Sequence, residues 1–271
     1  MLVGAQGMGG KLNLFASTAM VSGIFVGLNP ALAKDPTTFT WTGCYIGLNA
    51  GGLSATLGHN VLLPAVAGGP PEQQFGDSGS GIGFIGGAQV GCNQQFYGDW
   101  VVGVEGDLNY ANGSHSFNTI FDASSYSLAS EDSYGPGSIS ARASLRWLGT
   151  FRGRFGYAFW NRDFIFVTGG LAFGRVDASA DGSVSNTIGS PFLFAGSYSA
   201  IRTGWVLGAG IEHAFTDRIT AKMEYLHFDL GDFNYLVSGS NGGGNLPAVW
   251  NANGSVSGNL VRVGLNIKII P

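Results

Sequence analysis

From about residue 41 onward, the chain alternates apolar side chains with small or polar ones, in stretches of about ten residues. Successive side chains of a β-strand point to opposite faces, so this alternation predicts strands with one apolar and one polar face. The clearest stretch runs from Arg142 to Tyr157, where four arginines occupy even positions and aromatic residues dominate the odd ones. In a soluble protein the aromatic face would form the core. In a membrane barrel that face would contact lipid and the arginines would face the lumen.

The composition favours the second arrangement. Charged residues make up only 11% of the 271 residues, aromatic residues make up 13%, and the formal net charge is −4. A soluble domain usually carries about a quarter charged residues, whereas a wall that faces lipid needs none. The chain has no basic run or stripe, so we expect no nucleic-acid partner.

The first 33 residues have the pattern of an export signal. Lys11 precedes a mostly apolar stretch, Leu12 to Leu28, and Ala31 to Ala33 supply small residues at a cleavage site. We therefore predict a cleaved signal peptide over residues 1–33, with a transmembrane anchor as the alternative. No later run of about twenty apolar residues occurs, so helices are not expected to span a membrane.

The remaining alternation predicts eight strands, at residues 41–51, 82–96, 100–110, 140–158, 164–176, 200–215, 219–230 and 259–270. Connections after the second, fourth and sixth strands are short. The others span about 24 to 30 residues that are rich in Gly, Ser, Asn and Pro. This asymmetry is typical of bacterial outer-membrane barrels, whose short turns face the periplasm. The prediction for residues 34–271 is an all-β, eight-stranded antiparallel transmembrane barrel with long extracellular loops, located in the cell outer membrane.

The two cysteines fall on adjacent predicted strands. Cys44 is in step with Ile46 and Leu48, and Cys92 is in step with Val90, so both are expected on the lipid side. Export permits a disulfide between them. Two isolated apolar thiols are the alternative.

Extending the alternation to every strand places a set of charged side chains in the lumen: Glu105, Asp107, Arg142, Arg146, Arg152, Arg154, Glu212, Lys222, Glu224, Arg262 and Lys268. Four acids face seven bases. An eight-stranded lumen is just wide enough for side chains to fill it, so we expect these groups to interlock as a plug. A weak anion-selective path is the alternative.

Aromatic residues are expected at two levels of the wall. Trp41, Phe96, Trp100, Phe159, Trp160 and Phe215 fall toward the short turns, and Tyr110, Trp205 and Tyr225 fall farther along the strands. Amphipathic rings prefer membrane interfaces. The predicted loops 111–139 and 177–199 also carry aromatic residues, which either bind a surface partner or fold over the rim and bury one another.

Several segments resemble one known family. Trp41 to Gly51, Gly103 to Asp107, Trp147 to Tyr157, Ala221 to Leu226 and Val261 to Asn266 are similar to strands of the Omp25/Omp31-like outer-membrane proteins of alphaproteobacteria, also called porin-family or outer-membrane immunogenic proteins. The resemblance implies an abundant, surface-exposed eight-stranded barrel with an envelope role and no shared enzymatic activity. It implies contact with outer-membrane lipid and lipopolysaccharide, and with the barrel-assembly machinery during biogenesis.

Motifs for catalysis are mostly absent from the sequence. Gly81 to Gly86 fits the spacing of a dinucleotide-binding loop but lies within a predicted strand and precedes no helix. The histidines are scattered, so we expect no catalytic site, no metal site and no cofactor. The best components of an enzyme would be His115 or His227 with Asp122, Asp132 or Asp229.

Three functions remain open at this point. The first is a structural barrel that maintains the envelope and presents surface loops. The second is a small-solute diffusion channel with a basic lumen. The third is an adhesin that acts through its loops.

Overall fold

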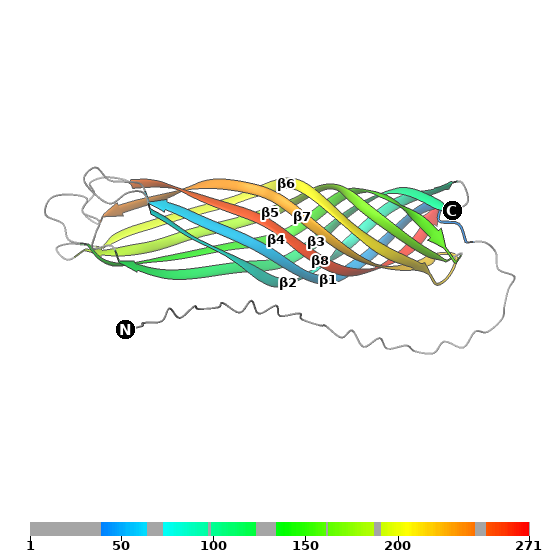
Figure 1. Cartoon of the computed structure of the whole chain (residues 1–271), viewed down its shortest axis with the longest axis horizontal. Coiled ribbons are helices and arrows are strands. Elements are labelled where there is room, and N and C mark those ends of the chain that lie inside the picture. Colours follow the sequence, from blue (N-terminus) through cyan, green and yellow to red (C-terminus); the bar gives the residue numbers. More distant parts are fainter. Residues whose placement is uncertain are drawn as a thin grey trace, which may run out of the picture. The chain divides into compact units, whose positions relative to one another are not determined.

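The structure is a computed structural model that describes residues 39–63, 73–96, 99–122, 134–160, 162–186, 191–241 and 248–270. Eight antiparallel strands form a closed barrel in which each strand pairs with its neighbours in sequence and β8 pairs with β1 (Figure 1). They are β1 (Gly43–Leu63), β2 (Gln73–Phe96), β3 (Trp100–Asp122), β4 (Tyr134–Phe159), β5 (Asp163–Asn186), β6 (Phe192–Ala214), β7 (Ile219–Asn241) and β8 (Ala248–Ile270). The predicted eight-stranded antiparallel barrel is confirmed.

Two further sequence predictions concern the export signal and membrane-spanning helices. The predicted signal peptide, residues 1–33, lies outside the described residues and stays a prediction. No described helix is long and apolar enough to cross a membrane.

The strands are much longer than the sequence predicts. They run for 21 to 26 residues, whereas about 9 to 11 tilted residues cross a bilayer. The predicted bounds are close at the short turns and wrong at the opposite end. The segments 111–139 and 177–199, expected as loops, are largely strand. Their Gly-, Ser- and Asn-rich composition resembles that of loops, but pairing with neighbouring strands continues through them.

The barrel has two halves that differ in which face is apolar. We call the half next to the short turns the membrane half, because its outward face carries exposed side chains such as Leu48, Leu108 and Val263. We call the other the outer half, because its outward face is mainly Ser, Asn, Asp and Arg beyond the level of Tyr110 and Trp205. Its interior is an apolar cluster that includes Leu53, Leu57, Ile139, Leu145, Val176, Phe228, Leu230, Phe233, Val237 and Val256.

Two β-bulges shift the alternation near the boundary between the halves. In β4, Leu145 pairs with Val176 and Trp147 with Arg175, so Arg146 is an extra residue. Leu145 and Leu148 are consequently both buried although they are three positions apart. In β7 the register shifts between Asp229 and Asp232, around Gly231, whose φ is +72°. Each bulge reverses which parity of its strand faces inward.

The described ladder between β2 and β3 is shorter than the other ladders. It runs from the Phe96–Trp100 pair to the Ile85–Ala111 pair. Beyond that point, the side-chain oxygen of Asn112 accepts a hydrogen bond of 2.6 Å from the Phe84 backbone amide. A side-chain hydrogen bond thus links the two strands just beyond the described end of this ladder.

Candidate functional site: an ionic plug in the lumen

A cluster of eight charged side chains fills the lumen of the membrane half, and each of these residues is at most 7% exposed. We call this cluster the ionic plug. Its members are Glu105, Asp107, Arg152, Arg154, Glu212, Lys222, Glu224 and Arg262. Four carboxylates face four cations, so the plug carries no net charge. This balance is what makes burial possible, because an unpaired charge in a low-dielectric interior is very costly.

Arg152 lies at the centre of the plug and contacts three carboxylates. Its Nη1 donates to Glu224 at 2.9 Å, and its Nη2 donates to Glu105 and, at 3.1 Å, to Asp107. These acids come from β3 and β7, so one side chain from β4 ties three strands across the lumen.

Arg262 and Lys222 complete the central group. The Nε of Arg262 donates to Glu224 at 2.8 Å, and its Nη2 donates to Asp107 at 2.7 Å. The ammonium of Lys222 donates to Glu105 at 2.6 Å and lies 3.0 Å from Glu224. Glu105, Asp107 and Glu224 each therefore contact at least two cations.

A second group lies around Arg154. Its Nη2 donates to Glu212 at 2.6 Å, its Nη1 donates to the hydroxyl of Tyr45, and its guanidinium lies 4.1 Å from the centroid of the Phe166 ring. Glu212 also accepts a hydrogen bond of 2.8 Å from the side chain of Asn266. Neutral polar side chains thus extend the network around the charges.

Two-residue spacing in the sequence produces the plug. Glu105 and Asp107 share the inward face of β3, and Arg152 and Arg154 share that of β4. The β3–β4 register places Glu105 directly opposite Arg152. Sequence alternation therefore identified these partners correctly as inward-facing residues.

Two of the residues expected in the lumen lie elsewhere, and a third lies at its turn end. Arg142 and Arg146 are exposed, because the bulge at Arg146 reverses the facing of β4 beyond it. Lys268 keeps the inward parity of β8 but is only partly buried near the short turns, where it lines a small cavity with Tyr45 and Glu212 and donates to the Thr40 carbonyl at 2.8 Å. With Arg142 and Arg146 outside and Lys268 apart from the ion pairs, the buried charges of the lumen balance, and the expected excess of seven bases over four acids is wrong.

One aromatic prediction also changes. Trp41, expected at the membrane interface, is buried inside the barrel at the turn end. It packs with Phe39 and Phe164, at ring-centroid distances of 4.9 and 5.1 Å. Trp100, Trp160, Phe215, Tyr110, Trp205 and Tyr225 are exposed on the outer wall, as expected. The inward parity of Trp41, which it shares with Tyr45, was the signal available in the sequence.

The aromatic side chains that the structure describes in the two segments expected as loops lie inward. Phe194 is buried in the apolar core, and Phe117 and Tyr198 pack against it. These three side chains complete the core of the outer half.

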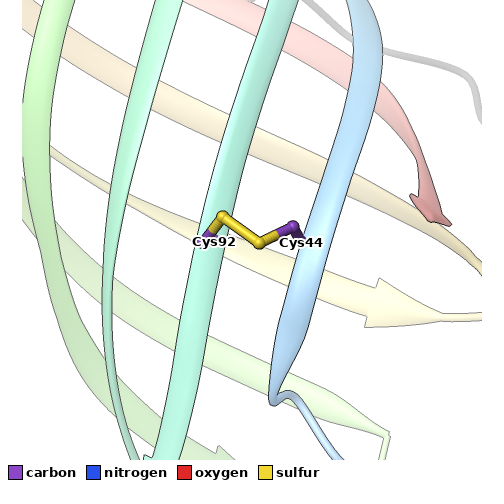
Figure 2. The surroundings of a disulfide bond; sticks show 2 residues. All are labelled: Cys44 and Cys92. Atoms are coloured by element: carbon purple, nitrogen blue, oxygen red, sulfur yellow. A yellow bond between two sulfur atoms is a disulfide. The ribbon is translucent and has the colours of Figure 1, made fainter. Parts of the chain in front are cut away.

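Cys44 and Cys92 lie directly opposite each other on β1 and β2. The structure joins them by a disulfide, seen in Figure 2 as a link between the two neighbouring strands. The bond links the two strands near the short turns.

The contacts described for the residues considered for an enzyme are with residues outside that set, and the side chain of Asp122 is not described. His115 lies 3.5 Å from Asp77, and the imidazole of His227 lies 2.9 Å from the side chain of Asn259. Asp229 accepts a hydrogen bond from the Gly231 amide, and Asp132 lies outside the described residues. Within the described ranges, no group of three or more His, Cys, Asp or Glu could hold a metal ion.

A closed eight-stranded barrel with a polar, charge-filled lumen and an apolar belt defines a bacterial outer-membrane β-barrel protein. Residues 19–267 match the family model described as outer membrane protein beta-barrel domain, and the chain belongs to this family.

Two relatives specify the family further. The chain is 34% identical over 267 residues to the 31 kDa outer-membrane immunogenic protein of Brucella melitensis, covering 94% of this chain and 95% of that protein. It is 33% identical over 177 residues to the 22 kDa outer membrane protein of Rhizobium leguminosarum, covering 64% of this chain and 67% of that one. The chain is an outer-membrane protein of the Omp25/Omp31 type, which confirms the predicted family and location.

Solved barrels show weaker similarity. The outer membrane protease OmpT from Escherichia coli matches with a TM-score of 0.44 and 9% identity, covering 86% of this chain and 98% of that one. The outer membrane protein OprG from Pseudomonas aeruginosa matches with a TM-score of 0.38 and 12% identity, covering 84% and 96%.

Proposed function

We propose that this protein is a non-enzymatic, closed barrel that strengthens the outer membrane and presents its outer half to the surroundings. The ionic plug is the observation that carries the proposal. A solute passing through the membrane half would have to separate Arg152 and Arg262 from their carboxylates, and each separation leaves buried charges without partners.

The apolar core of the outer half supports closure at a second level. Leu57, Leu145 and Phe228 are fully buried in the barrel interior, farther from the short turns than the plug. Close-packed apolar side chains leave little room for water or ions. A solute would therefore meet two different barriers in series, one ionic and one apolar.

Two observations support the absence of catalysis. The relatives carry the names of immunogenic and outer-membrane proteins, and each charged group of the plug is already paired with an opposite charge. A paired guanidinium or carboxylate has little capacity left to bind a substrate.

Single-channel recording of the refolded mature protein in a planar bilayer tests closure. We expect no resolved openings after a heat-modifiable gel shift has shown that the barrel is folded. Arg152→Ala, which removes the central plug cation, serves as the comparison. Steady wild-type openings would by themselves overturn the proposal in favour of the diffusion channel, whether or not this variant refolds.

A further inference from the structure

Outward-facing cations of the outer half are confined to one side of the barrel. Among the described residues beyond the aromatic level they are Arg142, Arg146 and Arg175, all on the adjacent strands β4 and β5. Arg202, the remaining cation of this half, has the inward parity of β6 and donates to the Asp232 carbonyl. Such clustering on two paired strands suggests a binding surface.

Asp177 holds two of these arginines beside each other. Its carboxylate lies 2.8 Å from the Nε of Arg146 and 3.3 Å from the Nε of Arg175. The Ser199 hydroxyl donates to the same carboxylate at 2.5 Å and accepts from Arg175 at 2.9 Å. The hydrogen bond from Ser199 lowers the pKa of Asp177, with further lowering by the two arginines, so this carboxylate stays ionised.

The two guanidiniums retain unused donors. Arg146 engages Asp177 through Nε alone, and Arg175 uses Nε and one Nη. Their side chains are 64% and 51% exposed, respectively. With Arg142 farther along β4, three cations outnumber the outward-facing Asp177 and Asp181, so the patch is positively charged.

An aromatic pair lies next to the arginines on the same two strands. Trp147 adjoins Arg146, and Phe173 is two residues from Arg175, in each case toward the short turns. The two rings pack edge to face with centroids 6.1 Å apart. Aromatic rings at this position mark the membrane interface, so the guanidiniums lie at the depth of lipid headgroups.

We propose that Arg146 and Arg175 bind a phosphate group of an outer-leaflet lipid, while Trp147 and Phe173 contact its acyl region. Guanidinium groups form strong, directional hydrogen bonds to phosphate oxygens. Asp177 acts as a positioning residue that orders both guanidiniums before the lipid arrives. The site rests on the placement of the outer half outside the membrane and is independent of whether the lumen is closed.

Binding of bisphosphorylated lipid A to the refolded full-length mature barrel in detergent tests the proposal, with native mass spectrometry as the readout. We expect the double variant R146Q/R175Q to bind at least about tenfold more weakly, since each lost charge-assisted contact is worth about that factor. The control R162Q/R218Q removes two arginines near the short turns and should bind like the wild type. A heat-modifiable gel shift verifies the fold of each variant.

Two further probes separate a lipid site from a simple anion site. Dephosphorylated lipid A should bind as weakly to the wild type as lipid A binds to R146Q/R175Q, and inorganic phosphate alone should bind far more weakly than lipid A. Equal binding of both lipids, equal binding by R146Q/R175Q and the wild type, or comparable binding of free phosphate would each overturn the proposal. None of these outcomes bears on the conductance experiment, so the two proposals fail separately.

Discussion

The membrane half and the outer half use the same strands and the same alternation, yet they place opposite chemistry inside. In the membrane half, charged groups such as Arg152 are buried in the lumen and Leu48 faces outward, whereas in the outer half Leu57 is buried and Ser and Asn face outward. The reason is the solvent. Lipid favours an apolar wall and water favours a polar one, so each half turns outward the face that its surroundings favour. A period-two pattern therefore specifies two faces but not which face is the interior.

The sharpest test of this contrast is the removal of a plug cation. Arg152→Met should lower the free energy of unfolding by about 3–5 kcal/mol or abolish refolding, because Glu105, Asp107 and Glu224 lose their shared partner. Arg146→Met, on the same strand in the outer half, removes an exposed ion pair and should cost at most about 1 kcal/mol. Urea titration in lipid vesicles, followed by tryptophan fluorescence, measures the free energy of unfolding of both variants. Equal effects would mean that the two halves do not differ in this way.

Two leucines on β1 give the matching test for apolar side chains. Leu57 is 0% exposed inside the outer half, and Leu48 is 69% exposed on the membrane wall. Leu57→Ala should cost about 2–5 kcal/mol because it leaves a cavity in addition to the lost transfer energy. Leu48→Ala should cost only the transfer part, about 0.8 kcal/mol per methylene, because mobile acyl chains fill the space. If the same urea titration gave equal free energies of unfolding for Leu57→Ala and Leu48→Ala, the interior of the outer half would not be close-packed.

The smallest expected effect concerns the bulge that reverses β7. Gly231 has a φ of +72°, and a Cβ there would meet only the Arg202 side chain, at 3.7 Å. Gly231→Ala should therefore cost about 1–2 kcal/mol through backbone strain rather than a clash. Gly52→Ala is the control, since a Cβ there meets nothing within 4 Å, and we expect a change below about 0.5 kcal/mol. No difference between the two variants in unfolding free energy would show that the bulge does not require glycine.

The sequence was a good guide to the membrane half, where the alternation is strong and uninterrupted. The two-residue periodicity correctly predicted the number of strands, the inward facing of Glu105 and Arg154, and the common parity of Cys44 and Cys92. This prediction works because successive side chains of a regular strand point to opposite faces, whatever lies at either end of the strand.

The outer half was misjudged for two physical reasons. Its outward residues are Ser, Asn and Gly, which are also the residues of loops, so β-strand pairing beyond the membrane could not be recognised. The bulge at Arg146 also reverses which parity of β4 faces inward. Extending the alternation across this bulge therefore assigned Arg142 and Arg146 wrongly to the lumen. A bulge has no clear signature in one sequence, because it depends on how the neighbouring strand pairs.

The exact balance of acids and bases in the plug has an evolutionary consequence. A single substitution that neutralises or reverses the charge at one of these eight positions leaves another charge without its counterpart, so we expect such changes to persist only as compensating pairs. Side chains on the outward face of the outer half are free of that constraint. Descendants of this chain can therefore diversify the outward surface of the outer half while inheriting the same ion-paired membrane half.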